Sequence, residues 1–283
     1  MVKGSEMPNA NSFQAFFDET SSYLTPQSLK YDKAFNQFSN RLLVQSFFEL
    51  LDASESKTFL ELGAHRAMAS RHFMRQGNEH FAIAVEANPY NFEKFRENVE
   101  KGGTIYKNMA LTAVSGPISL QLKDHDRARK RGHTSTSNSL LKRSGFSEYK
   151  EVEVRGITFD DLTSEAVAAG EIPPIDQEPP VVWIDVEGAT SQLIEGATQA
   201  LPSCLAIMVE VEAEPIFVGQ VTVEGVDAQI RALGFRPILR DCEFHPRQYN
   251  IIYVNERLLD ESIVGPLIDA FETACSEFDG TEA

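Results

Sequence analysis

The sequence predicts an α/β fold built on one mostly parallel sheet with helices on both faces. From residue 58 onward, short apolar runs alternate with segments of helical periodicity, the pattern of successive βαβ units. Several of these runs end in Gly, Asp or Glu, at the sheet edge where α/β proteins bind ligands. With 283 residues, of which 42% are hydrophobic, the chain is long enough for one large domain with a sizeable core.

Seven runs are expected to form the strands of the sheet, three before a long interruption and four after it. The runs span residues 58–62, 81–86, 104–107, 181–185, 204–212, 235–240 and 249–254. Crossovers between the parallel strands are expected to be right-handed. Only a short turn separates the last two runs, too little chain for a helical crossover, so we expect the last strand to be antiparallel.

Helices are expected between the strands and at both ends of the chain. In the sheet region they span 66–76, 89–101, 159–169, 189–200 and 222–233, and a last amphipathic helix covers 261–278. Apolar residues recur at helical spacing on either side of Pro26, so residues 11–53 are expected to form a helical pair. We therefore expect an N-terminal helical extension (1–55), a sheet domain (56–258) and a C-terminal helix (259–283).

An insertion interrupts the alternation of strands and helices at about residues 115–155. Residues 117–122 and 150–156 alternate like exposed antiparallel strands, which predicts a β-hairpin with a long loop. That loop contains a basic run, residues 123–143, with seven Lys and Arg against two Asp. The run is either a solvated loop or a segment that receives an anionic substrate, and both interpretations stay open.

Composition excludes several classes of partner. The formal net charge is −16, and about −21 outside the basic run, so the surface should repel nucleic acid and anionic membranes. The three cysteines are far apart and form neither a disulfide framework nor a zinc pattern. No export signal opens the sequence, and no apolar run approaches bilayer-spanning length. A cytoplasmic protein is expected.

The end of the first strand carries the first candidate for cofactor binding. A glycine directly after a strand lets the backbone pass close to a ligand, so Gly63, Ala64 and His65 are expected to contact a cofactor. Glu61 either faces the ammonium of S-adenosylmethionine or anchors the turn. Only the first glycine of the dinucleotide fingerprint G-x-G-x-x-G is present, which disfavours a nicotinamide cofactor.

The second strand ends in Glu86, Ala87 and Asn88, about two dozen residues beyond the glycine turn. An acidic side chain at this position is placed to accept hydrogen bonds from ribose hydroxyls. The two strand ends together therefore indicate an adenosine cofactor, without separating a nicotinamide dinucleotide from S-adenosylmethionine.

The fourth strand ends in two carboxylates, Asp185 and Glu187, directly after a buried apolar run. A helix cap explains one such carboxylate well and two less well, so we interpret the pair as part of an active site. Of Glu210 and Glu212 on the next strand, one is expected to face the same site. The candidates for a general base are Asp185, Glu187, Glu210, His125 and His133, with His133 carried on the basic run as a lid.

Taken together, these segments resemble the FkbM-type methyltransferases over roughly residues 58–255. The blocks that carry the resemblance are E-L-G-A-H (61–65), V-E-A-N-P-Y-N-F (85–92), N-M-A-L (108–111), T-S-N-S-L (136–140), V-E-V-R-G-I-T-F-D-D-L (152–162), I-D-V-E-G-A (184–189) and V-E-V (209–211). The resemblance implies the Rossmann-like class I methyltransferase fold, S-adenosylmethionine as cofactor (S-adenosylhomocysteine as product), and Asn108 among the cofactor-binding residues. It further implies O-methyl transfer to a hydroxyl of a small molecule, sugar or glycan precursor.

Four positions depart from the family pattern. His65 and Ala67 stand where the family commonly has Asn and Gly, and Trp183 and Thr190 where it often has Lys and Glu. A scaffold without turnover is therefore an alternative, and a nicotinamide-dependent oxidoreductase a weaker one. Paired carboxylates can hold a divalent cation, but no further ligands cluster with them, so no metal is expected. An anionic acceptor and a homodimer are left open.

Overall fold

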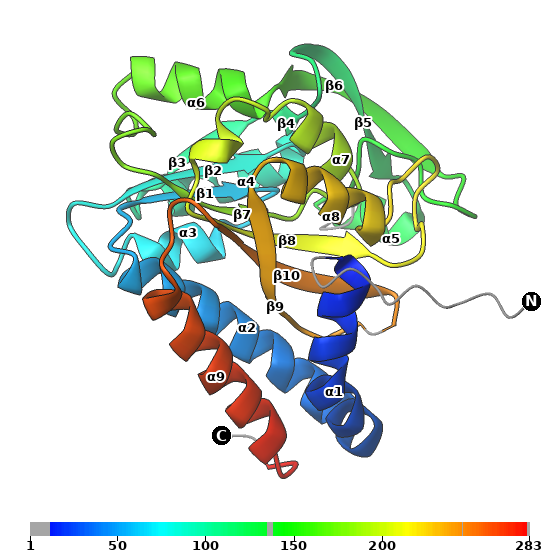
Figure 1. Cartoon of the computed structure of the whole chain (residues 1–283). Helices are drawn as coiled ribbons and strands as arrows, with labels where there is room; N and C mark the ends of the chain where they lie inside the picture. The colour runs from blue at the N-terminus through cyan, green and yellow to red at the C-terminus, as the bar shows by residue number, and fades with distance from the viewer. Residues whose placement is uncertain (1–11, 135–137, 245, 282–283) are drawn as a thin grey trace, which may run out of the picture.

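The structure is a computed structural model of the chain, and it describes residues 12–134, 138–244 and 246–281. A seven-stranded sheet lies between two layers of helices, with a smaller three-stranded sheet beside it (Figure 1). The parts of the predicted terminal segments, basic run and T-S-N-S-L block that fall on residues 1–11, 135–137 and 282–283 lie outside the described residues.

The large sheet has the strand order β3-β2-β1-β7-β8-β10-β9. Its strands are β1 (Thr58–Leu62), β2 (Phe81–Glu86), β3 (Ile105–Asn108), β7 (Val181–Ile184), β8 (Ala206–Glu212), β9 (Phe235–Arg240) and β10 (Gln248–Asn255). Only β10 runs antiparallel, and it lies between β8 and β9. The seven predicted strands and the antiparallel last strand are confirmed, and the arrangement is that of the class I methyltransferase fold.

Each face of the sheet builds its own hydrophobic core, because side chains along a strand point alternately to opposite faces. Leu60 and Leu62 pack toward α6 (Phe159–Ala168), α7 (Thr190–Glu195) and α8 (Val223–Ala232). Phe59 points to the other face, in the core that includes residues of α1 (Phe13–Tyr31), α2 (Lys33–Ala53), α3 (Met68–Phe73) and α9 (Glu261–Glu277). The predicted placement of helices on both faces is thereby confirmed.

The N-terminal helical pair breaks at Asp32, not at Pro26. Asp32 adopts a positive φ of 46°, whereas Pro26 lies inside α1. Proline removes one helical hydrogen bond, but tertiary contacts hold α1 on both sides of it. Leu24 is buried in the core, and the buried guanidinium of Arg240 donates to the Thr20 hydroxyl at 2.7 Å. Packing therefore outweighs the local helix-breaking effect.

The insertion forms the second sheet. β5 (Gly116–Lys123) and β6 (Tyr149–Ile157) pair antiparallel as predicted, and the two-residue strand β4 (Ala110–Leu111) pairs parallel with β6. Two residues are too few to show a period, so the sequence could not predict β4. Part of the basic run folds into the short helix α5 (Asp126–Lys130).

Some helices end earlier than their periodicity predicts. α4 (Pro89–Glu100) matches the expected range closely, but α7 ends at Glu195 where a helix to residue 200 was expected. A Cβ at Gly196 would lie 2.3 Å from the Thr112 carbonyl oxygen, so the chain turns where it meets a neighbouring segment. None of the helices in the described part of the chain has the length and hydropathy needed to cross a membrane.

Candidate active site

A cleft opens at the carboxyl ends of the central strands, as expected for a doubly wound sheet. The Gly63 turn and Asp185 stand in its middle. The region of the cleft near the end of β2 is lined by Val85–Asn88, Met109–Leu111, Leu120 and Asn138–Leu140, and the region near Trp183 by Glu61–Ala64 and Trp183; His65 and Glu187 line both regions. The strand ends singled out in the sequence therefore meet in one place.

Gly63 allows two strand ends to approach closely. Its φ is +87°, and a Cβ at this position would lie 1.7 Å from the backbone oxygen of Asp185. Any other residue would both strain the backbone and collide with the end of β7. The turn that follows is held by N–H bonds from Gly63 and Ala64 to the Val85 carbonyl, at 2.9 and 2.8 Å. The glycine thus fixes the floor of the cleft.

Glu61 anchors the turn. Its buried carboxylate accepts hydrogen bonds from the Ser70 backbone N–H at 2.7 Å and from the Ser70 hydroxyl at 2.5 Å. Burial raises the pKa of Glu61 to about 7, although both bonds favour the ionised form. Because Glu61 also lines the Trp183 side of the cleft, it retains a surface toward a ligand.

Glu86 organises the region of the cleft at the end of β2. One carboxylate oxygen accepts from the His65 N–H at 2.8 Å, and the other accepts from the Asn88 N–H at 2.8 Å and the Asn91 amide at 3.3 Å. Burial raises the pKa of Glu86 to about 7. A carboxylate has about four lone-pair sites, so Glu86 keeps acceptor capacity for a ligand hydroxyl.

Two asparagines shape the loop after β2. Asn88 caps α4 by accepting from the Tyr90 N–H at 2.9 Å, and its amide donates to the His133 carbonyl at 2.9 Å. The Asn108 amide donates to the carbonyls of Glu86 and Ala87, at 2.8 and 3.2 Å. Asn88 lines the cleft itself, whereas Asn108 is not among the lining residues and supports the loop from behind.

The family departures at His65 and Ala67 leave the turn in a left-handed conformation. Their φ values are 47° and 50°, a region that Asn and Gly adopt more readily than other residues. The Tyr106 hydroxyl donates to the His65 carbonyl, and Ala67 is buried against Val99 and Tyr106. Tertiary contacts therefore hold His65 and Ala67 in the left-handed backbone conformation that Asn and Gly would adopt more readily.

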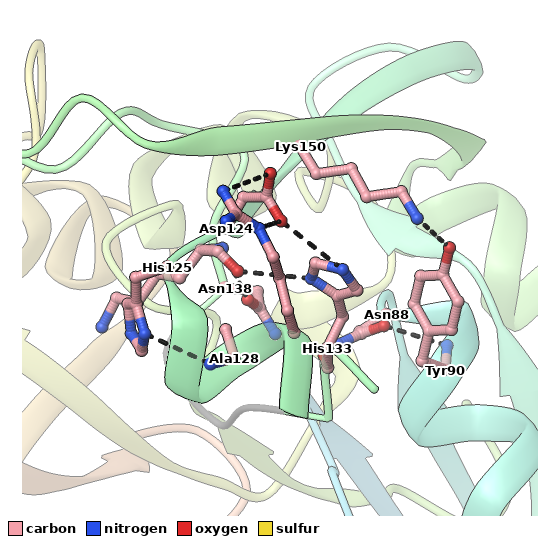
Figure 2. A network of polar contacts seen from close by, with 10 residues as sticks. Asn88, Tyr90, Asp124, His125, Ala128, His133, Asn138 and Lys150 are labelled. Atoms are coloured by element: carbon pink, nitrogen blue, oxygen red, sulfur yellow. Dashed lines mark hydrogen bonds and ion pairs between the residues drawn. The ribbon is translucent and has the colours of Figure 1, made fainter. Parts of the chain in front are cut away.

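The two candidate histidines of the basic run lie outside the cleft lining. Figure 2 shows the His133 ring beside the carboxylate of Asp124 (Nε2, 3.6 Å). The other ring nitrogen, Nδ1, lies 3.4 Å from the carbonyl oxygen of Lys123. The centre of this ring lies 5.6 Å from that of Tyr90. His125 caps α5, where its Nδ1 accepts from the Ala128 N–H at 3.2 Å. Through its own carbonyl, His133 joins the insertion to Asn88 at the edge of the cleft.

Four carboxylates gather at the ends of β7 and β8. Burial is the largest cause of their raised pKa values, about 6 for Asp185, about 8 for Glu187, about 7 for Glu212 and well above the usual range for Glu210. Repulsion from Asp185 raises the pKa of each of the other three further. The expectation that only one of Glu210 and Glu212 faces the site is wrong, because residues two apart in a strand lie on the same face.

Neither Asp185 nor Glu187 caps the following helix. Ala189 occupies the cap position of α7, and no side chain bonds to the first turn. Glu187 instead adopts a positive φ of 49°, and its carbonyl accepts from the Ser139 hydroxyl at 2.6 Å. The cap interpretation therefore loses its basis, and both side chains line the cleft.

Trp183, one of the four departures from the family pattern, lines the cleft. Its ring is only partly buried, and it meets Phe47 edge-on with ring centres 6.1 Å apart. It lines the cleft beside Glu61 and also a groove between α2 and α3. The sequence signal for this role was the position of Trp183 two residues before Asp185, at the end of the same strand. Among the described residues, no three His, Cys, Asp or Glu side chains are arranged to ligate a metal.

A cleft built on a glycine turn and acidic strand ends, at the mouth of a class I methyltransferase sheet, defines the class of this protein. The family model described as the methyltransferase FkbM domain matches residues 61–237, more than half of the chain, so the chain belongs to the FkbM methyltransferase family. The matched segment is therefore an S-adenosylmethionine-dependent methyltransferase domain.

Individual relatives are more distant. The hexuronic acid methyltransferase AglP of Haloferax volcanii is 30% identical over 133 residues, 46% of this chain and 47% of that protein. The match thus spans about half the length of this relative. Among solved structures, magnesium protoporphyrin IX methyltransferase (ChlM) of Synechocystis PCC 6803 with S-adenosylmethionine bound is 8% identical, with a TM-score of 0.43, covering 90% of this chain and 100% of that chain.

A second structure, 1,6-didemethyltoxoflavin-N1-methyltransferase of Burkholderia thailandensis, is 11% identical, with a TM-score of 0.38, and covers 89% of this chain and 93% of that chain. At these identities the likeness concerns the fold alone.

Proposed function

We propose that the protein transfers the methyl group to a hydroxyl of a small molecule, sugar or glycan precursor. The observation that carries this proposal is the group of buried and partly buried carboxylates beside the Gly63 turn, with Asp185 at its centre. A hydroxyl acceptor must lose a proton as its oxygen is methylated, and a carboxylate within hydrogen-bond reach can accept that proton.

The cofactor fits the side of the cleft formed by β1 and β2. Glu86 has acceptor capacity left for ribose hydroxyls, and Ala87 and Asn88 continue the same wall beside Gly63 and His65. A buried carboxylate such as Glu61, which within the described residues accepts its hydrogen bonds from Ser70, suits a ligand that carries positive charge. When bound, S-adenosylmethionine supplies an electrophilic methyl group at this site.

Two carboxylates take different parts in the proposed reaction because their pKa values differ. Asp185, with a pKa of about 6, is mostly ionised at neutral pH and accepts the proton of the acceptor hydroxyl. Glu187, with a pKa of about 8, is mostly protonated and donates a hydrogen bond that orients the acceptor. His133 is proposed as a positioning residue, because it acts on the cleft through Asn88.

A sugar or glycan precursor is the acceptor that the AglP relative favours, since that protein is named for methylation of hexuronic acid. Aligning the acceptor oxygen with the methyl group is mainly a positioning task. We propose that residues 56–258 form the domain that does so, with the segments 1–55 and 259–283 as helical support.

The test is a transfer assay with methyl-labelled S-adenosylmethionine and a panel of sugars, uronic acids, phenols and amines, followed by mass spectrometry of the product. Label on a hydroxyl oxygen supports the proposal. Label exclusively on nitrogen, carbon or sulfur atoms would contradict it, while leaving the methyltransferase class intact.

A further inference from the structure

Two cations from opposite ends of the basic run lie beside Glu187. Lys123 is the last residue of β5, and Arg143 follows the segment 138–140 that lines the cleft. Both are only partly exposed. Their charges act on the Glu187 carboxylate, where each lowers a pKa that burial has raised. The insertion therefore brings positive charge to the acidic end of the cleft.

The backbone fixes Lys123 against the cleft wall. The Lys123 N–H donates to the Asn138 side chain at 3.4 Å, and Gln121 and Ser139 exchange backbone hydrogen bonds at 2.8 and 3.4 Å. The hydroxyl of Ser139 in turn donates to the Glu187 carbonyl at 2.6 Å. A short chain of contacts thus leads from β5 to Glu187.

Arg143 is held by two further contacts. Tyr149 stands opposite Lys123 in the β5–β6 ladder, and its hydroxyl accepts from the Arg143 N–H at 2.6 Å. Arg143 also forms an isolated antiparallel bridge with Phe217. The Phe217 ring lies so close to Gly188 that a Cβ there would be 2.5 Å from its Cδ2 atom. The Arg143 backbone is thus fixed beside Phe217, which packs against Gly188.

This corner contains polar groups that lack partners. Within the described residues, neither Lys123 nor Arg143 has a side-chain hydrogen bond or ion pair. Gln121, which lies on the same face of β5 as Lys123, has a buried Oε1 without a hydrogen bond, and so does the Nε2 of Gln220 beside Gly188. Buried polar atoms without partners are costly and rare, so a ligand that bonds them would be stabilised here.

The remaining cations of the basic run have a different setting. Arg127, Lys130 and Arg131 are exposed on or next to α5, and Arg129 forms an ion pair with Asp124 at 3.1 Å. Like Lys123 and Arg143, they are absent from the cleft lining, but none of them is among the charges that act on the Glu187 carboxylate. Charge alone could not distinguish these side chains from Lys123 and Arg143 in the sequence, whereas their positions in the fold do.

We propose that Lys123 and Arg143 form an anion-binding end of the acceptor site, and that the acceptor carries a carboxylate near the hydroxyl that is methylated. This inference rests on the proposed function. A guanidinium pairs with a carboxylate through two parallel hydrogen bonds. A carboxylate fits better than a dianionic phosphate, because Asp185, which is mostly ionised at neutral pH, acts on the same site and repels additional negative charge.

The experiment compares matched pairs of methyl glycosides, a uronic acid and the neutral hexose of the same configuration (gluco, galacto and manno). Their binding to the protein loaded with S-adenosylhomocysteine is measured by saturation-transfer NMR and calorimetry. For at least one pair, the uronic acid should bind at least about tenfold more tightly than the hexose, and Lys123→Gln and Arg143→Gln should each remove most of this preference.

Lys123→Arg keeps the charge and should retain the preference. The double variant Lys130→Gln, Arg131→Gln removes two exposed charges and should leave it unchanged, and calorimetry with S-adenosylhomocysteine shows that each variant is folded.

Equal binding within all three pairs overturns the inference, and so does a preference that survives both Lys123→Gln and Arg143→Gln. Tighter binding of the matched sugar 6-phosphates than of the uronic acids overturns the assignment to a carboxylate. Because binding is measured without turnover, the outcome is separate from the transfer assay. If the protein methylates a hydroxyl but shows no preference for uronic acids, the proposed function holds and the anion-binding inference is wrong.

Discussion

The two sides of the cleft hold their carboxylates in different ways. On the side formed by β1 and β2, Glu61 and Glu86 accept short hydrogen bonds from backbone N–H groups, including that of Ser70 at 2.7 Å. On the side formed by β7 and β8, Asp185 and Glu187 lie in a group of four carboxylates, of which Glu212 is buried and the others are partly buried, and the charge of Asp185 raises the pKa of the other three.

This difference assigns the two groups of carboxylates different roles: one fixes the backbone geometry of the cleft, and the other has a protonation state that can change. A carboxylate that binds several backbone donors fixes the path of the chain and presents a set geometry to a ligand. A carboxylate that faces other carboxylates has a protonation state that responds to whatever binds nearby. We expect changes on the first side to alter cofactor affinity, and changes on the second side to alter turnover.

The largest effect is expected for Asp185→Asn. Loss of the general base should lower kcat for methyl transfer by about 10²- to 10⁴-fold, while the affinity for S-adenosylhomocysteine changes far less. The melting temperature should not fall, because the amide removes a repulsive buried charge. Asp161→Asn, which neutralises a carboxylate on the exposed start of α6, is the matched control. Full activity of a folded Asp185→Asn enzyme would remove Asp185 from the mechanism.

Glu86→Ala should act on cofactor binding. The ribose acceptor disappears, and the N–H groups of His65 and Asn88 lose their partner. We expect the Kd for S-adenosylhomocysteine to rise by about 10- to 100-fold, as for loss of hydrogen bonds to a charged group. Glu86→Gln keeps one carbonyl oxygen and should lose less. If calorimetry gives the wild-type affinity for Glu86→Ala, the assignment of the second strand end is wrong.

The stability of the free protein should fall as the pH rises from about 5 to 8. Glu61, Glu86 and Glu212 have pKa values raised to about 7, well above those of an unfolded chain. The folded state therefore binds more protons than the unfolded state in this range, and it loses that advantage as the groups ionise. Thermal unfolding at several pH values measures the slope. A melting temperature that rises across this window would show that these carboxylates are not buried as described.

The smallest effect is expected for Ala67→Gly. Glycine relieves the left-handed φ of 50°, by about 1–2 kcal/mol. The loss of a buried methyl group against Val99 and Tyr106 offsets a gain of this size. Urea unfolding should therefore give a free energy within about 1 kcal/mol of the wild type. A larger loss would mean that packing of the methyl group, and not backbone strain, dominates at this turn.

Much of the fold follows from the sequence because the strands are continuous apolar runs and the helices have a clear period. The exceptions are places where distant contacts decide. Pro26 stays inside a helix because Leu24 and Thr20 are held by other elements, and α7 ends at Gly196 because the chain meets Thr112 there. No local pattern carries such information.

The candidate site shows the same limit. Strand ends brought Gly63, Glu86 and Asp185 together as expected, since parallel strands share one binding edge. That Lys123 and Arg143 both act on Glu187 was not visible, because it depends on how the chain between β5 and β6 folds back beside the cleft. From the sequence, His133 was a candidate general base near the acceptor. In the structure its ring lies beside Tyr90, outside the cleft lining.

The most direct test of the account is isothermal titration calorimetry of the purified protein with S-adenosylhomocysteine, with NADH as the control ligand. The account predicts binding of S-adenosylhomocysteine with a Kd on the order of micromolar, no binding of NADH, and weaker binding of S-adenosylhomocysteine by Glu86→Ala. Absence of S-adenosylhomocysteine binding by the folded wild-type protein would contradict it, because the turn at His65 and Ala67 would then no longer form the cofactor site.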